Sequence, residues 1–505
     1  MDKPLTIRLD SADNTVLALR DIPAGTFLPE EGVTVRSDIP LGHKIATRPI
    51  AKGEPVLKCD TVIGYASRDV ECGTHMHNDT IRFDAVAGTV DYCADYRPVE
   101  LVPEAQRRTF RGFVRADGSV GTRNCIAVIA CSNCAATVVR RIAARFEDLT
   151  GWPHVDAVVP LITSTGCGIE KSGVPLAYMR RVLAGSIRNP NFAGALVVAL
   201  GCENNNIDAF FRETGLVPGP MLRRLVIQEE GGGRASVDKG AAMVEEMLAR
   251  AEQCRRTPVS VSELKVALEC GGSDAFSGVS ANPALGKAMD LLVRQGGTAI
   301  LTEPTEFVGI EGSLARRART PEVAQQVMDM MAWWREYLKG TDSQINGKVT
   351  PGNNAGGITN VLEKALGSTR KAGSTPLNAV FGYAEPITER GFVIMNAPSY
   401  DPVSAAAMFA GGANLCAFTT GRGSLYGAQH FPTVKISSNT RRYELQGDDI
   451  DLNAGAVIDG EKTLDEMGSE IFEALIAAAS GERTKSELFG MGADEFVIWD
   501  IGTTA

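Results

Sequence analysis

Two of the five histidines of this chain lie in the segment GTHMHNDT, where His75, His77 and Asp79 recur at every second position. On an extended strand, residues with this spacing point to the same side. Imidazole nitrogens and a carboxylate in this arrangement suit a divalent iron, manganese or zinc ion. The alternative interpretation is a polar, solvent-facing edge of a terminal strand. We predict that His75 and His77 bind a metal ion or transfer a proton.

Cysteines follow several of the apolar runs in the sequence. Cys167, Cys202 and Cys270 each come at the end of such a run, and Cys134 follows another run and opens a helical stretch. Thiolates are ligands for soft metal ions and iron–sulfur centres, whereas a buried cysteine can simply act as a small apolar side chain. No CxxC…CxxC pattern favours the first interpretation. We predict Cys167, Cys202 and Cys270 as metal ligands and keep the apolar alternative open.

Three glycine-rich segments, CGGSD, TPGNNAGGITN and TTGRGSLYG, are candidate anion sites. Glycines let backbone N–H groups approach an oxyanion, and the guanidinium of Arg422 can hold a carboxylate with two hydrogen bonds. None of the three is a Walker or GxGxxG motif, which argues against a nucleotide. Each one alone could be an ordinary turn. The residues predicted to bind substrate are Ser273, Asp274, Asn353, Asn354, Gly421 and Arg422.

Acidic residues cluster in LTEPTEFVGIEG, which contains Glu303, Glu306 and Glu311. Carboxylates that follow a strand can take up a proton or bind a metal ion, but they can equally cap a helix or face solvent. Lys371, in KALGSTRKAGS, is a candidate carboxylate clamp or base, and its alternative is a surface lysine. We predict Glu303 and Lys371 as catalytic residues.

Two kinds of element must position these residues. Residues 1–83 contain short alternating runs separated by Gly, Pro and Asp turns, which is typical of a small all-β module. From residue 109 onward, buried runs such as CIAVIA and LKVALEC alternate with amphipathic stretches, which predicts an α/β body with mainly parallel sheets. Ligands of such sheets bind at the carboxyl ends of the strands. The predicted parts are the β module 1–83, a linker 84–108, an α/β domain 109–258 and a second α/β domain 259–505.

The composition narrows the class of protein. The chain has 505 residues and a net charge of −10, and no Lys/Arg run suggests a nucleic-acid surface. Its start lacks the order of a signal peptide, and its apolar stretches are too short to cross a membrane. Eleven cysteines without framework spacing favour reduced thiols in a cytoplasm. We therefore expect a cytoplasmic protein that binds a small molecule, not nucleic acid or a membrane.

Longer motifs resemble one known family. GFVRADGSVGTRN, GCGIE, NPNFAGALVVALGCENN, LECGGSDAFSGVSANPALG and TPGNNAGGITNVLEKALGSTRKAGS are similar to the altronate/galactarate dehydratases along nearly the whole chain. The first 83 residues resemble the SAF (β-clip) domain of these enzymes. The resemblance implies a hydro-lyase that converts a hexonate or hexarate to a 2-keto-3-deoxy acid. It also implies a divalent metal, Fe²⁺ first and Mn²⁺ second, and we expect a homo-oligomer.

The segment GTHMHN looks like the GxHxHxHN motif of altronate-type members, which favours an aldonate substrate. The chain departs from that motif at Asn78 and Asp79, where a third histidine is usual, and it has Thr165 in place of a tyrosine. A related sulfo-lyase branch carries the small and large domains on separate chains, which counts against that activity here.

Other hypotheses stay open. They are a galactarate dehydratase, an iron–sulfur-dependent dehydratase, and a carbohydrate-binding protein without turnover. A nicotinamide oxidoreductase is disfavoured because the dinucleotide fingerprint is missing.

Overall fold

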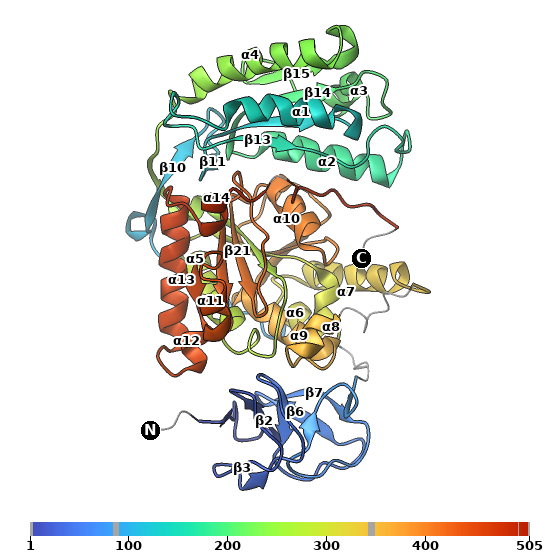
Figure 1. Ribbon diagram of the computed structural model, residues 1–505, viewed down its shortest axis with the longest axis vertical. Helices are drawn as coiled ribbons and strands as arrows, with labels where there is room; N and C mark the ends of the chain where they lie inside the picture. The colour runs from blue at the N-terminus through green and yellow to red at the C-terminus, as the bar shows by residue number, and fades with distance from the viewer. Residues whose placement is uncertain (1–3, 84–89, 342–348, 493, 503–505) are drawn as a thin grey trace.

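Three folded parts follow one another along the long axis of the molecule, and the C-terminal domain lies between the N-terminal module and the middle domain (Figure 1). This computed structural model describes residues 4–83, 90–341, 349–492 and 494–502. The first residues of the predicted linker, 84–89, lie outside the described residues. The C-terminal domain therefore has one neighbour at each end, and each contact can form a site.

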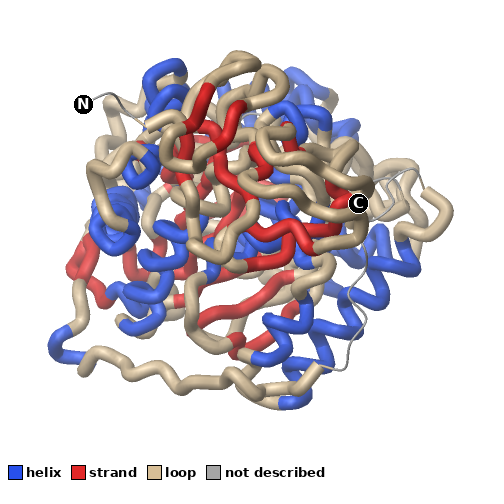
Figure 2. Tube along the Cα trace, turned by 90° about the horizontal axis from the view of Figure 1, so that it is seen from below, coloured by secondary structure: helices blue, strands red, loops and turns tan. Residues whose placement is uncertain are grey.

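The N-terminal module consists of short antiparallel strands and turns, which Figure 2 shows from below. One sheet has the order β1-β2-β5-β8, a second has the order β6-β7-β9, and β3 pairs with β4. Alternate residues of these strands, such as Val16, Ile45 and Val56, fill two small cores. The strands are β1 Thr6–Ile7, β2 Thr15–Ala18, β3 Phe27–Leu28, β4 Val33–Thr34, β5 Lys44–Ala46, β6 Pro55–Lys58, β7 Thr61–Ala66, β8 His75–Met76 and β9 Ile81–Arg82.

The middle domain has a parallel sheet of order β13-β12-β14-β15. Every residue of β12 is buried because helices cover both of its faces. Its strands are β12 Cys125–Ala130, β13 Val158–Leu161, β14 Phe192–Ala199 and β15 Leu222–Val226, and its helices are α1 Ala136–Ala143, α2 Val174–Arg188, α3 Ile207–Thr214 and α4 Gly233–Ala251. The antiparallel strands β10 Thr109–Val114, β11 Val120–Gly121 and β16 Thr257–Ser260 form a separate sheet at the start and end of this domain.

The C-terminal domain is built on a seven-stranded parallel sheet of order β19-β20-β18-β17-β21-β22-β23. Its strands are β17 Lys265–Cys270, β18 Thr298–Leu301, β19 Leu377–Phe381, β20 Gly391–Met395, β21 Leu415–Thr420, β22 Thr433–Ser437 and β23 Leu452–Asn453. Its helices are α5 Ala281–Arg294, α6 Glu311–Arg316, α7 Pro321–Tyr337, α8 Pro351–Ala355, α9 Val361–Ser368, α10 Asp401–Ala410, α11 Thr440–Leu445, α12 Gly455–Ile458, α13 Leu464–Ala479 and α14 Lys485–Phe489.

The predicted fold class is confirmed. The six apolar runs read as buried strands are β12, β13, β14, β17, β18 and β21. Helix α1 ends at Ala143, and a 3-10 turn, Ala144–Phe146, follows it. No helix in the described ranges has both the length and the apolar character needed to cross a membrane.

Candidate functional site

Three histidines of the N-terminal module form one cluster. The ring centroids of His43, His75 and His77 lie 5.0, 5.0 and 5.3 Å apart, and Nδ1 of His43 is 2.8 Å from Nε2 of His75. The cluster forms because β5 pairs with β8 in the register Ile45↔His75, which brings the residue before β5 beside the end of β8. The rings of His75 and His77 lie side by side as predicted, but only His75 belongs to the strand, because β8 ends at Met76; His43 joins them.

The histidine cluster faces the C-terminal domain. Nε2 of His43 lies 3.2 Å from the carbonyl oxygen of Ala355, and Nε2 of His77 lies 3.0 Å from that of Asn354. Since a carbonyl can only accept, each Nε2 carries a hydrogen and Nδ1 of His43 is left to accept from His75. Burial lowers the pKa of His43, and burial followed by the charge of His43 lowers the pKa of His75 to about 4. Both rings are neutral at physiological pH, the state in which imidazole binds metal ions.

Asp79 does not join the histidine cluster. Strand β8 ends at Met76, and a turn follows in which the backbone N–H of His77 donates to the hydroxyl of Thr80. The carboxylate of Asp79 faces the surface, where it pairs with Arg68 at 3.3 Å. The period-two pattern therefore holds for the two histidines and stops before the aspartate.

A buried ion pair fixes the module on the C-terminal domain. The ammonium of Lys44, fully buried, donates to both carboxylate oxygens of Glu363 at 3.0 Å and to the carbonyl of Gly357 at 2.6 Å. Lys58 donates to the same carboxylate at 2.9 Å, and Thr359 adds two further hydrogen bonds. Burial lowers the pKa of Lys44 to about 8 against the opposing charge of Glu363. Because every donor and acceptor has a partner, this contact sets where the three histidines lie.

A cavity of about 300 Å³ lies beside the histidine cluster, between the module and the C-terminal domain. Its lining includes Ala355, whose carbonyl faces His43, and the side chains of Arg422, Arg441 and Arg442. Burial, and then the charges of Arg422 and Arg441, lower the pKa of Arg442. Its buried Nε has no hydrogen-bond partner among the residues that the structure describes. Three guanidinium groups, one of which has a buried Nε without a partner, form a site that favours an anion such as a carboxylate.

The predicted glycine-rich segments form the floor of this cavity. Asp274 lines it, but its carboxylate already accepts hydrogen bonds from Ser277, Ser438 and Asn439. Gly421 is required there, because a Cβ at this position would lie 2.3 Å from Oδ1 of Asp274. The role of Asp274 in this structure is to hold the turn in shape.

The remaining predicted substrate contacts also organise backbone. Asn353 caps α8 together with Thr350 and donates to the carbonyl of Ser273 at 2.9 Å. The side chain of Asn354 donates to Ile358, and its carbonyl faces His77. These side chains shape the two loops that face the module.

Buried carboxylates lie under the glycine-rich turn. Glu269, Glu303 and Asp401 offer oxygen atoms that all lie within 4.8 Å of one another. Burial and the neighbouring carboxylates raise the pKa values of Glu269 and Glu303 well above the ordinary range, and burial followed by Glu306 raises that of Asp401 to about 6. These shifts favour the protonated forms of Glu269 and Glu303, so Glu303 suits the role of a proton donor better than that of a base.

Lys371 is buried and charged. Its ammonium donates to Sγ of Cys270 at 2.8 Å. Burial opposes the charge, but the neighbouring Cys270 and Glu306 outweigh it and raise the pKa of Lys371 above its ordinary value. A permanently protonated lysine does not act as a base, so its predicted catalytic role narrows to electrostatic stabilisation. Cys270 belongs to this buried group and is paired with Lys371 and Glu306.

The other two predicted cysteine ligands lie in the middle domain. Cys167 and Cys202 are exposed at the carboxyl ends of β13 and β14, and Cys134 accompanies them at the end of β12. The structure therefore brings Cys134, not Cys270, to Cys167 and Cys202.

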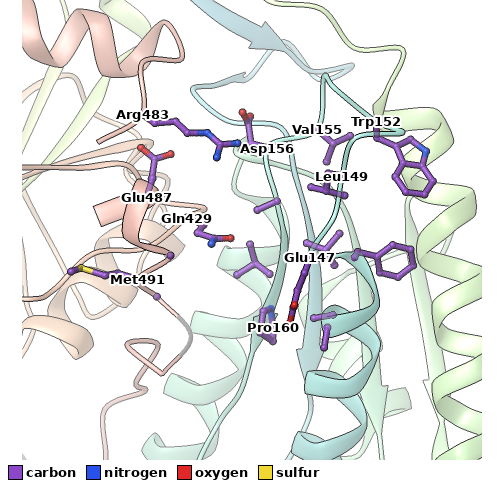
Figure 3. Close-up of a pocket in the computed structure, with 18 of the residues that line it drawn as sticks. Glu147, Leu149, Trp152, Val155, Asp156, Pro160, Gln429, Arg483, Glu487 and Met491 are labelled. Atoms are coloured by element: carbon purple, nitrogen blue, oxygen red, sulfur yellow. The ribbon is translucent and has the colours of Figure 1, made fainter. Parts of the chain in front are cut away.

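A larger cavity, of about 680 Å³, lies between the middle and C-terminal domains (Figure 3). Leu149, Trp152, Val155 and Pro160 line one side, and Gln429, Arg483 and Glu487 line the other. None of the predicted site residues lines it, and the carboxylate of Glu487 is already bound by Arg123. The smaller cavity is the better candidate for a reaction site, because three arginines line it and the imidazoles of the histidine cluster lie next to it.

The sequence analysis missed His43, Arg441, Arg442, Glu269 and Asp401. A usable signal existed for three of them: His43 is one of only five histidines, and Arg441 and Arg442 are adjacent cations just after the buried strand β22. The two carboxylates gave no local signal, because they meet only through the parallel sheet.

Three family models match consecutive parts of the chain. The altronate/galactarate dehydratase SAF domain matches residues 4–84. The second domain of D-galactarate dehydratase/altronate hydrolase matches residues 112–252, and the C-terminal domain of D-galactarate/altronate dehydratase matches residues 261–504. Together these matches cover the three folded parts described above.

Curated relatives match over nearly full length. The chain is 34% identical to altronate dehydratase of Bacillus subtilis over 95% of this chain and 96% of the relative. It is 33% identical to altronate dehydratase of Escherichia coli, with coverage of 95% and 96%, and 33% identical to galactarate dehydratase (L-threo-forming) of Escherichia coli, with coverage of 96% and 95%. On these matches, the chain belongs to the altronate/galactarate dehydratase family.

Proposed function

We propose that this protein removes water from an altronate-like hexonate or a hexarate and yields a 2-keto-3-deoxy acid. The observation that carries the proposal is the covered contact between the module and the C-terminal domain. There, three arginines line one cavity of about 300 Å³, and the histidine cluster lies next to it through the contact of His43 with Ala355. A site of this size and charge suits a small hydroxylated carboxylate.

The arginines would bind the substrate carboxylate. Removal of the proton next to a carboxylate builds negative charge on that group, so the reaction needs fixed positive charge at this point. Arg422, Arg441 and Arg442 supply it, and an anion would satisfy the buried Nε of Arg442. Binding and charge stabilisation would therefore come from the same three side chains.

The histidine cluster fits a divalent metal, with Fe²⁺ as the first and Mn²⁺ as the second expectation. Three imidazoles with centroids about 5 Å apart are ligands that such ions accept, but their ring nitrogens are not all within 4.8 Å of one another and several are engaged in hydrogen bonds, so binding would require the rings to turn. His43, His75 and His77 would hold the ion. When bound, it would supply Lewis-acid stabilisation of the developing charge.

Proton movement would use the chain's own groups. His43 and His75 share a hydrogen bond of 2.8 Å, along which a proton can pass between the rings. Under the glycine-rich turn, the protonated Glu303 and the charged Lys371 keep the carboxyl ends of β17 and β18 from carrying net negative charge. The departing hydroxyl needs a proton donor, and the candidates are the His43–His75 pair and Glu303.

An experiment must decide between a hexonate and a hexarate substrate, because the altronate dehydratases and the galactarate dehydratase are almost equally similar to this chain. Metal-stripped protein, restored with Fe²⁺, is incubated with altronate, galactarate and related acids, and the 2-keto-3-deoxy product is assayed. We expect product from altronate first. Measurable binding of the acids without product would contradict the proposal and would support a carbohydrate-binding protein instead.

A further inference from the structure

Three exposed cysteines lie at one edge of the sheet in the middle domain. Cys134 lies in the 3-10 turn Asn133–Ala135 after β12, Cys167 follows β13, and Cys202 follows β14. Strand β12 pairs in parallel with both β13 and β14. Because the carboxyl ends of neighbouring parallel strands meet at the same edge, the three thiols belong to three adjacent loops.

Backbone hydrogen bonds tie these loops together. The N–H of Asn133 donates to the carbonyl of Thr165 at 2.9 Å, and the N–H of Asn205 donates to that of Gly166 at 3.0 Å. The sulfur of Cys167 lies close enough to Cys134 for a thiol–thiol hydrogen bond, and Cys202 lies within electrostatic range of it. The cysteine loops therefore form one unit.

A glycine precedes two of the three cysteines and fixes its loop. Gly166 has φ +105°, and a Cβ there would lie 2.5 Å from the carbonyl oxygen of Cys131. Gly201 has φ +127°, and a Cβ there would lie 2.6 Å from Oε1 of Gln228. Both positions demand glycine, so the repeated Gly-Cys pair presents each thiol at a defined place.

The exposure of these thiols is unusual. Cysteine is among the most buried residue types, and Cys125, Cys131 and Cys416 of this chain follow that rule. Three exposed thiols at one sheet edge contribute nothing to a core. Their exposed sulfur atoms are accessible to a metal centre, as the sulfur atoms of cysteine ligands must be.

The distances between the sulfur atoms help to distinguish a site for a single metal ion from a site for a polynuclear cluster. A tetrahedral ion with metal–sulfur bonds of about 2.3 Å holds its sulfurs about 3.8 Å apart. Among the described residues, the trio of metal-binding side chains whose donor atoms all lie within 4.8 Å is Glu269, Glu303 and Asp401, and the cysteines are not so close. A polynuclear cluster binds each thiolate through a different iron, so Cys134 and Cys167, the closer pair, would have to turn apart on binding, which their exposure permits.

We propose that Cys134, Cys167 and Cys202 are the ligands of a [4Fe–4S] cluster. On binding, each of the three thiols gives up its proton and forms one Fe–S bond to a different iron, with no change in oxidation state. The fourth iron receives no thiolate from this trio and stays open to water or to an oxygen of a hydroxy acid. This centre is additional to the histidine site and does not depend on it.

The test is anaerobic reconstitution of the full-length protein with ferrous and ferric iron in equal amounts and sodium sulfide. That mixture supplies the mean oxidation state of a [4Fe–4S]²⁺ cluster. We expect about four sulfide per chain with a brown absorption band, and about four iron in addition to the one expected at the histidine site. Cys134→Ser, Cys167→Ser and Cys202→Ser should lose the sulfide and the band and keep no more than about one iron per chain. Because these thiols are exposed, the substitutions leave the thermal unfolding midpoint in place.

Matched variants decide between this trio and other sites. Cys270→Ser and Cys72→Ser keep the full sulfide content and the brown band, and His77→Ala keeps both even if its turnover is lost. Loss of the cluster in Cys270→Ser with retention in Cys134→Ser would overturn the assignment. So would uptake of a single zinc ion without sulfide, which indicates a mononuclear site.

Discussion

The two parallel sheets of this protein treat the carboxyl ends of their strands in opposite ways. In the middle domain these ends expose three thiols. In the C-terminal domain they carry carboxylates, a lysine and arginines, and a separate β module covers part of them with three imidazoles. The same architecture thus offers soft ligands to solvent at one place and hard, charged groups in a covered cavity at the other. The difference teaches that the covering module, not the sheet, decides which edge can hold a small anion.

Removal of metal should have the largest effect on the covered site. Treatment with a chelator is expected to reduce turnover below detection, and added Fe²⁺ should restore it, because the developing charge then lacks its cation. Binding of Mn²⁺, followed by its electron paramagnetic resonance, provides a readout without substrate. Full activity in chelated protein with no bound metal would contradict a metal-binding role for the covered site.

Substitution of one histidine should come next. His43→Ala or His77→Ala is expected to lower turnover by about 10²- to 10⁴-fold, because each removes a ligand or proton carrier from the cluster. Asp79→Ala is the matched control: its side chain lies on the surface with Arg68, and turnover should stay near normal. An equal loss of turnover in the histidine variants and in Asp79→Ala would show that turnover depends on the integrity of the module and not on the imidazoles.

Loss of the buried ion pair between Lys44 and Glu363 should lower the stability of the contact between the module and the C-terminal domain. Glu363→Gln leaves the buried Lys44 without a counter-charge and is expected to cost about 3–5 kcal/mol. The effect is measured as the free energy of opening at the amides of β5 by hydrogen exchange. Glu71→Gln removes an exposed partner of Arg36 and should cost less than about 1 kcal/mol. A small effect at Glu363 would mean that other contacts hold the module.

The smallest of these effects is expected at the arginines. Arg442→Ala should raise KM about tenfold or more, since a charge-assisted hydrogen bond contributes about 1.5–3 kcal/mol. Arg483→Ala, in the larger cavity of Figure 3, should leave KM unchanged. If KM rises only in the Arg483 variant, the substrate binds between the middle and C-terminal domains instead.

Much of the fold could be predicted because buried parallel strands have a local signal: every residue of CIAVIA is buried, and so is every residue of LKVALEC except Lys265. His75 and His77 were predictable for a similar reason, since their spacing is local. His43 was not, because only the antiparallel pairing of β5 with β8 brings it to them. Cys270 shares its sequence context with Cys167 and Cys202, but it lies in a different sheet, and chain order alone does not reveal that.

The buried contact of Lys44 with Glu363 has a consequence for how a molecule reaches the histidines. Two fully desolvated charges cannot be drawn apart by small steps, because each would face a partially dry gap before water could replace its partner. We therefore expect the module to stay docked during turnover and small molecules to enter through the cavity of about 300 Å³ beside the cluster. A fixed opening of this kind would admit one monosaccharide acid at a time and exclude longer sugar chains.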